Sequence, residues 1–276
     1  MLDVRNLSLQ TKGGFRLQNL SFEVGTGQMV GILGPNGAGK STLLAALAQP
    51  GPEVEGQIRW NAFSLKEYPL QQLARERAMF TQKTEVSADF TAEEIVLMGR
   101  YPHGKGLASP DDHRIADAAM LATETLPFAH RSMRALSGGE QQRIHLARAS
   151  AQVWEGLEKD DQPKLLLLDE PLNNLDIRHQ HAALQFARDF AEAGNVVLMV
   201  MHDLNLAAMY AHRILMLCDG AQMAYGDPAT VLNETLLEHC YRCPVSVQTH
   251  PFHACPVVFF RNATSAAPNS RNQTAP

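Results

Sequence analysis

The chain has 276 residues, enough to bury the core of one domain or of a domain with a subdomain. Its content of 45% hydrophobic and 19% charged residues is that of an ordinary globular protein, and its net charge of −5 argues against a nucleic-acid-binding protein, which usually carries a basic face. No apolar run approaches the length of a membrane span and no export signal opens the sequence, so we expect a cytoplasmic protein that reaches a membrane only through a partner.

Strand-like and helix-like segments alternate along most of the chain. Residues 2–10 and 15–24 alternate apolar and polar side chains, as two half-buried strands joined by a turn do. Continuous apolar runs at 28–34, 164–170 and 195–201 are typical of strands buried on both faces. Shorter strands are expected at 56–60 and 77–82, and helices at 40–49 and 177–194. This alternation predicts an α/β fold with a mostly parallel sheet, preceded by an antiparallel β part.

Between Lys83 and about Ala151 the pattern becomes helical. Thr91 and Glu94 form a capping box before one helix, and Ser109 with Pro110 opens another. We therefore expect a helical subdomain over about 83–151, inserted into a single domain that spans 1–261. The remaining residues, 262–276, are small, polar and proline-bearing, and are expected to be disordered.

The sequence "GPNGAGKST" matches the phosphate-binding pattern G-x-x-x-x-G-K-[ST], and it follows a buried strand and opens a helix, as that pattern requires. Its glycines let the backbone turn N–H groups toward phosphates, and the helix N-terminus adds positive potential. Lys40 is expected to bridge the outer phosphate oxygens and the Ser41 hydroxyl to ligate Mg²⁺. The residues of the motif that carry this expectation are Gly34, Gly37, Gly39, Lys40 and Ser41.

Two acidic residues end the apolar run "LLLLDE". Asp169 is expected to hold Mg²⁺ through water, and Glu170 to act as general base toward the water that attacks the outer phosphate. His202 closes the next buried strand, where it can orient Glu170 and contact the outer phosphate. Gln82, at the end of "RAMFTQ", is a weaker candidate for a contact with Mg²⁺ and the attacking water.

A second anion-receptive helix start occurs at "LSGGEQQR". One nucleotide needs only one phosphate loop, so this turn is free to meet the nucleotide of another chain. A second copy, turned head to tail, would place Ser137, Gly138 and Gly139 on the exposed outer phosphate. The sequence therefore predicts a homodimer that holds two ATP molecules between its chains and reopens after hydrolysis.

Together with "NNLD" at 173–176, these motifs occur in the order typical of ABC transporter ATP-binding subunits, which the chain resembles from Leu2 to about Phe260. The resemblance implies a P-loop NTPase core, with Mg²⁺ bound by Ser41 and Gln82 and by Asp169 through water. It also implies that Glu170 is the base, that His202 is a switch histidine, and that residues 173–176 cross the dimer interface. The nucleotide contacts that it implies are Gly34, Pro35, Asn36, Gly37, Ala38, Gly39, Lys40, Ser41 and Thr42, with Ser137, Gly138, Gly139 and Glu140 on the ATP of the partner chain. A groove near Gln82, between the helical insertion and the sheet, would receive a transmembrane permease subunit.

The segments "FTAEEIVLMGRYPH" and "MHDLNLAAMYAHRILMLCDGAQMAYGDPATVL" resemble ATPases that drive uptake of iron-siderophores, haem and cobalamin. Within that group, "SAQVWEGLEKDDQPKLLLLDEP" and the "LDIRHQHAAL" that follows it are most similar to the haem importers. The implied partners are a permease and, indirectly, a periplasmic or surface substrate-binding protein, with the ATPase on the cytoplasmic face of the inner membrane. Siderophore and cobalamin import remain alternatives for the cargo. A soluble ABC ATPase of the assembly type is the alternative of another class, and binding to a permease would separate the two.

The expected adenine contact departs from the family pattern, and a group of cysteines and histidines has two possible interpretations. The family's adenine-stacking aromatic would fall near Thr11, which cannot stack, and the nearby Phe15 is better explained as a core strand residue. A group of cysteines and histidines near the C-terminus has a composition that suits metal, but Cys240 fits the apolar face of a helix, and three prolines interrupt the chain after that helix. Its members are His239, Cys240, Cys243, His250, His253 and Cys255.

Overall fold

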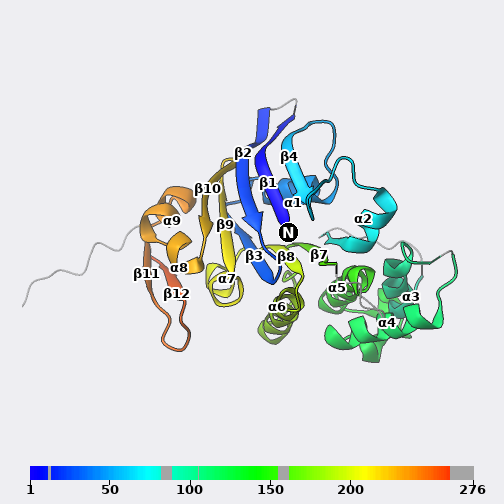
Figure 1. Cartoon of the computed structure of the whole chain (residues 1–276). Helices are drawn as coiled ribbons and strands as arrows, with labels where there is room; N and C mark the ends of the chain where they lie inside the picture. Colours follow the sequence, from blue (N-terminus) through cyan, green and yellow to red (C-terminus); the bar gives the residue numbers. More distant parts are fainter. Residues whose placement is uncertain (12–13, 82–88, 105, 155–161, 262–276) are drawn as a thin grey trace, which may run out of the picture.

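A single ten-stranded sheet forms the centre of the computed structural model, which describes residues 1–11, 14–81, 89–104, 106–154 and 162–261. Neighbouring strands follow the order β5-β4-β1-β2-β10-β9-β3-β8-β7-β6 (Figure 1). The parallel part consists of β9 (Arg213–Cys218), β3 (Gln28–Leu33), β8 (Val196–Val200), β7 (Leu165–Asp169) and β6 (Arg77–Phe80). The predicted apolar runs are the central strands of this part, which confirms the α/β prediction.

The other part of the sheet is antiparallel and is built mainly from the N-terminus. Its strands are β5 (Phe63–Ser64), β4 (Val54–Trp60), β1 (Leu2–Thr11) and β2 (Gly14–Val24), and β10 (Ala221–Gly226) joins β2 to β9. β1 and β2 pair antiparallel from Leu2 opposite Val24 to Thr11 opposite Gly14. The apolar–polar alternation of these two strands therefore predicted their pairing correctly.

Two apolar clusters lie on opposite faces of the sheet. In β8, Val197 and Met199 belong to the cluster that packs against α6 (Ile177–Glu192) and α7 (Leu204–Tyr210). Val196, Leu198 and Val200 belong to the cluster that contains α1 (Lys40–Ala48) and the antiparallel strands. Because successive side chains of a strand point to opposite faces, burial on both sides produces the continuous apolar run seen in the sequence. A further helix, α2 (Leu70–Glu76), leads into β6.

The segment before β7 is helical and has an apolar cluster of its own. It contains α3 (Ala92–Leu97), η1 (Met98–Arg100), α4 (Pro110–Ala122), η2 (Leu126–Phe128), η3 (Met133–Ala135) and α5 (Gly138–Val153). The predicted capping box of Thr91 with Glu94 is present, and Ser109 forms another with Asp112. These helices lie together at one end of the molecule (Figure 1). The boundaries 83–151 and 1–261 stay predictions.

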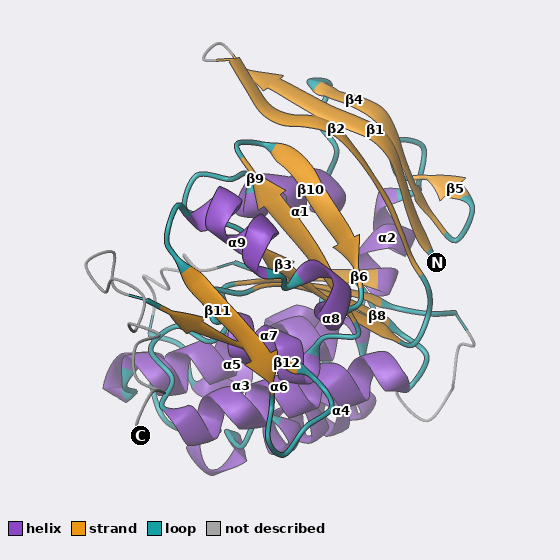
Figure 2. Ribbon diagram, turned by 90° about the vertical axis from the view of Figure 1, so that its left-hand side faces the viewer, coloured by secondary structure: helices purple, strands orange, loops and turns teal. Residues whose placement is uncertain are grey.

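The C-terminal part packs beside the sheet (Figure 2). It consists of α8 (Pro228–Val231), α9 (Glu234–Tyr241), β11 (Val245–Thr249) and β12 (Pro256–Phe260), and the last two strands pair as a separate antiparallel hairpin. The prolines after α9 were expected to interrupt regular structure, but Pro244 directly precedes β11, Pro256 is the first residue of β12 and Pro251 lies in the loop between the two strands. In the described ranges, no helix has both the length and the apolar content that a membrane span needs. The tail 262–276 lies outside the described residues.

Candidate active site

The phosphate-loop candidate connects β3 to α1 through a backbone that only glycines accommodate well. Gly34, Gly37 and Gly39 all have positive φ angles, of 147°, 82° and 96°. A Cβ atom on Gly34 would lie 2.1 Å from the carbonyl oxygen of Leu217, at the end of β9. Gly39 precedes α1 in a left-handed conformation, and no side chain of the described residues caps this helix. The first N–H groups of α1 are therefore available to an anion.

Lys40 is the only residue of this loop with a cationic side chain, and that side chain is buried. Its ammonium group donates to the carbonyl oxygens of Gly34 at 2.7 Å and Pro35 at 3.0 Å. Burial lowers the pKa of the Lys40 ammonium, while the carboxylates of Glu170 and Asp169 act in the opposite direction. The Lys40 ammonium therefore lies within the loop, close enough to Glu170 and Asp169 for their charges to act on it. Asn36, Gly37 and Ser41 are exposed at the same loop, whereas Ala38 is buried and Pro35, Gly39 and Thr42 are half-buried.

The first turn of α1 contacts the end of β7 through Ser41. The Ser41 hydroxyl donates to Asp169 Oδ1 over 2.9 Å, although the two residues are 128 positions apart in sequence. Burial raises the pKa of the Asp169 carboxyl, partly offset by this hydrogen bond. Ser41, a predicted Mg²⁺ ligand, and Asp169, predicted to hold the ion through water, are thus brought together, and both present oxygen atoms. The third predicted ligand, Gln82, lies outside the described residues.

Glu170 follows β7 directly and has a left-handed backbone with φ of 54°. His202, just after β8, contacts its Oε1 through Nε2 at 2.8 Å, and Asn173 donates from Nδ2 to its Oε2, also at 2.8 Å. Burial alone would raise the pKa of the Glu170 carboxyl, but the hydrogen bonds from Asn173 and His202 and the charge of Lys40 hold that pKa below its ordinary value. Glu170 is therefore favoured as the anion, the form that can accept a proton.

The "LSGGEQQR" segment contacts the backbone of the loop that carries Glu170. Gln142 on α5 donates to the backbone oxygen of Glu170 at 3.3 Å, and a Cβ on Gly139 would lie only 2.8 Å from the carbonyl oxygen of Asn174. Ser137 caps α5 in a capping box with Glu140, whose carboxylate accepts from the Ser137 hydroxyl at 2.8 Å. The start of α5 therefore packs on the loop that carries the acid, a contact that the sequence did not predict.

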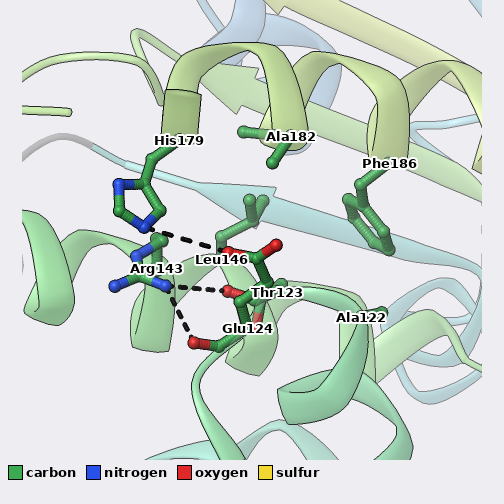
Figure 3. A pocket seen from close by; sticks show the side chains of 9 residues that line it. Ala122, Thr123, Glu124, Arg143, Leu146, His179, Ala182 and Phe186 are labelled. Atoms are coloured by element: carbon green, nitrogen blue, oxygen red, sulfur yellow. Dashed lines mark hydrogen bonds and ion pairs between the residues drawn. The ribbon is translucent and has the colours of Figure 1, made fainter. Parts of the chain in front are cut away.

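Farther along α5, hydrogen bonds from Arg143 join this helix to the residues that follow α4 (Figure 3). The guanidinium of Arg143 donates to the carbonyl oxygens of Thr123 at 3.4 Å and Glu124 at 2.8 Å. Arg178, at the start of α6, forms an ion pair with the Glu124 carboxylate at 3.0 Å. The enclosed cavity, bordered also by Leu146, His179 and Phe186, has a volume of about 10 Å³ and is too small for a nucleotide. The hydrogen bonds and the ion pair around this cavity join α4, α5 and α6.

The ABC transporter family matches residues 17–173, more than half of the chain. The chain belongs to the ABC transporter family. A hemin import ATP-binding protein of Methylobacillus flagellatus is 41% identical to this ABC ATPase over 97% of the chain and 98% of its own length. The protein of the same name from Pseudomonas entomophila is 42% identical over 95% of the chain and all of its own length.

Solved structures agree with this assignment. A chain of a transporter described as metal-chelate type, in an inward-facing conformation, has a TM-score of 0.78 at 26% identity and covers 95% of the ABC ATPase and 98% of itself. A bacterial ABC transporter cassette solved as a dimer has a TM-score of 0.71 at 26% identity, over 82% of this chain and 98% of its own. The same cassette is known in a post-hydrolysis state bound to ADP and phosphate, with a TM-score of 0.70. The fold is therefore a nucleotide-binding one.

The remaining candidates lie elsewhere. The side chains of Thr11 and Phe15, weighed for adenine stacking, fall outside the described part of the ABC ATPase. Among the described residues, no three His, Cys, Asp or Glu side chains gather as metal ligands. Cys240 is buried on α9, where burial and the neighbouring Cys218 raise the pKa of its thiol to about 12. A thiol in that environment resists the deprotonation that metal binding requires.

Proposed function

We propose that this ABC ATPase hydrolyses ATP as a homodimer to power the import of haem through a partner permease. The observation that carries the proposal is the Glu170 carboxylate, held between His202 and Asn173 beside the Ser41–Asp169 pair and the phosphate loop. An anionic, oriented carboxylate next to a phosphate-binding loop is what a general base for phosphoryl transfer to water needs.

In this proposal the loop from Gly34 to Thr42 binds the phosphates, with Lys40 moving from its carbonyl partners to the outer phosphate oxygens. The hydroxyl of Ser41 and the carboxylate of Asp169 fit Mg²⁺, because hard cations prefer oxygen ligands, and Gln82 would complete the set. When bound, Mg²⁺ supplies neutralisation of the phosphate charge. Glu170 takes the proton of the attacking water, and His202 keeps the carboxylate aligned. The products are ADP and phosphate.

The dimer is proposed from the second helix start. Ser137, Gly138, Gly139 and Glu140 would contact the ATP of the partner chain, and residues 173–176 would lie at the interface. The related cassette that was solved as a dimer supports this arrangement. The contacts of Gln142 and Gly139 with the loop of Glu170 would then connect the interface to the hydrolytic site.

The groove expected to receive the permease is near Gln82, which lies outside the described residues, and a second surface, on the helical segment, also suits a permease. A cavity of about 340 Å³ opens there between Leu97, Arg100, Tyr101 and Leu107. Leu107 and Tyr101 are 93% and 68% exposed, which is unusual for large apolar side chains at one place. We infer that a permease segment covers them and holds the ATPase at the cytoplasmic face of the inner membrane, while a periplasmic or surface substrate-binding protein delivers haem to the permease.

The cargo is inferred from the relatives, which are named hemin import proteins, and growth tests it directly. A deletion strain of the source organism would be grown on haem, on siderophore-bound iron and with limiting cobalamin, each as the sole supply, with the wild-type gene or its Glu170→Gln variant restored. Loss on haem alone, rescued only by the wild-type gene, is expected. Loss on siderophore iron or cobalamin would replace the cargo, and growth unaffected on all three would contradict the import role.

Substitution of the base tests hydrolysis itself. Glu170→Gln keeps the shape of the side chain but removes the proton acceptor, so kcat for ATP hydrolysis should fall by about 10²–10⁴-fold. ATP binding should persist, and the ATP-bound dimer should accumulate in light scattering because it no longer hydrolyses its nucleotide. Hydrolysis at the wild-type rate would show that Glu170 is not the base.

A further inference from the structure

We propose that Asn173 is a positioning residue that, with His202, aligns the Glu170 carboxylate for hydrolysis. The inference rests on the proposed function of Glu170 as the base. It extends the role expected of Asn173 from the sequence, which was that of an interface residue only.

The two donors approach different oxygens of one carboxylate. Asn173 Nδ2 lies 2.8 Å from Oε2 of Glu170, and His202 Nε2 lies 2.8 Å from Oε1. An ionised carboxylate only accepts hydrogen bonds, so the amide nitrogen of Asn173, rather than its oxygen, must face it. One donor would still allow the carboxylate to rotate about its last bond, whereas a donor on each oxygen fixes its plane. Each oxygen keeps a second lone pair with which to accept a proton.

The backbone explains why Asn173 reaches the acid. Glu170 has a φ of 54°, which turns the chain sharply after β7, and the N–H of Asn173 donates to the Glu170 carbonyl at 3.4 Å to close the turn. A left-handed backbone at a non-glycine residue is strained and persists only where its surroundings hold it. The turn thus places the side chains of residues 170 and 173 face to face at the cost of strain in the acid's own backbone.

The same turn is in contact with α5. Gln142 donates to the carbonyl of Glu170, and the carbonyl of Asn174 lies close against Gly139. Residues 139 and 142 are on the first turns of the helix that we expect to meet the partner's nucleotide. Asn173 therefore lies between the interface helix and the base, and a shift of this turn on dimer closure would change the alignment of Glu170 directly.

Two substitutions separate positioning from mere packing. Asn173→Asp keeps the size and shape of the side chain but replaces the donor with a carboxylate, whereas Asn173→Ala removes the donor and adds no charge. The purified full chain would be assayed with ATP and Mg²⁺. We expect Asn173→Ala to lower kcat by about 10-fold, the value of a lost hydrogen bond to a charged group, with KM within about two-fold. Asn173→Asp loses the same hydrogen bond and adds a like charge beside Glu170, so its kcat should fall further, by about 100-fold.

The decisive readout is the oligomer. If Asn173 acts on the base, Asn173→Asp should accumulate the ATP-bound dimer in light scattering, as Glu170→Gln does. Asn233→Asp makes the same change at the cap of α9, where Asp caps as well as Asn, and should match the wild type. A kcat for Asn173→Asp within two-fold of the wild type, or loss of the ATP-bound dimer together with activity, would overturn the positioning role. Hydrolysis that survives Glu170→Gln would instead overturn the proposed function, and this inference with it.

Discussion

Gly34 has no room for a side chain, because its Cβ would overlap the carbonyl oxygen of Leu217 at 2.1 Å and its φ is 147°. We predict that Gly34→Ala separates the phosphate loop from β9 and lowers the thermal midpoint of unfolding, through both backbone strain and overpacking. Gly37→Ala is the matched control, since Gly37 also has a positive φ, of 82°, but its Cβ would meet no atom within 4 Å.

The difference between the two alanine variants isolates the steric contribution. Gly37→Ala should cost about 1–2 kcal/mol of unfolding free energy from its backbone alone, and Gly34→Ala should exceed it by about 1–3 kcal/mol. Calorimetry would measure both in the absence of nucleotide. Equal midpoints would mean that β9 can move away from Gly34 without cost, and that the contact with Leu217 is not a constraint on the loop.

Single residues differed in how far their positions could be predicted. Asp169 ends β7, and Glu170 and His202 lie just after β7 and β8, two strands whose apolar runs are plain in the sequence and whose neighbouring parallel ends meet at one edge of the sheet. The contact of Asn173 with Glu170 could not be predicted, because it depends on a left-handed backbone at a non-glycine residue. No composition or period in the sequence signals that conformation.

Among the elements, α5 is joined to the end of α4 by a buried arginine of its own, Arg143. Arg143 donates to the carbonyl oxygens of the two residues that follow α4, Thr123 and Glu124, and burial lowers the pKa of its guanidinium despite the nearby Glu124 carboxylate. Replacement by Met keeps an extended apolar side chain but leaves these carbonyls without that donor. We predict that Arg143→Met lowers the unfolding free energy by about 1–3 kcal/mol, or roughly 2–4 °C per kcal/mol in calorimetry.

Arg178→Met provides the control, because this arginine contacts the same residue, Glu124, from an exposed position. Its side chain is 69% exposed, and an exposed ion pair contributes about 0–1 kcal/mol. The Arg178 variant should therefore stay close to the wild type. A larger effect at Arg178 than at Arg143 would mean that the ion pair, rather than the buried hydrogen bonds, joins α4 to α5 and α6.

The elements themselves were predictable where local signals were strong. Apolar runs located β3, β7 and β8, the capping box of Thr91 with Glu94 located the start of α3, and Ser109 with Pro110 located the start of α4. The hairpin of β11 and β12 was not predicted, because its prolines suggest interruption unless one knows that they stand before or at a strand start and in the loop. The pairing of β2 with β10 joins residues about 200 positions apart, through Gln18 and Ala221, and no local pattern reports it.

At the scale of the whole molecule, the proposed mechanism requires two chains. The phosphate loop and the Ser137 turn belong to different parts of the chain. A head-to-tail dimer would bring the Ser137 turn of each chain to the nucleotide bound by the phosphate loop of the other chain. Disruption of the Ser137 turn should therefore prevent closure of the dimer without weakening the binding of ATP to the monomer. Ser137→Arg tests this separation, because a long cation at the start of α5 obstructs the partner's phosphate while the phosphate loop is left unchanged.

Ser137→Arg also removes a helix cap, so its control must do the same elsewhere. Ser109→Arg removes the equivalent capping box of α4, formed with Asp112, and its cost is similar, about 0.5–2 kcal/mol. We expect both variants to bind a fluorescent ATP analogue as monomers with the wild-type affinity. In a Glu170→Gln background, Ser109→Arg should still form the ATP-bound dimer in light scattering, and Ser137→Arg should not. If Ser137→Arg lost monomer binding and dimer formation equally, the turn would act within its own chain, and the head-to-tail arrangement would be wrong.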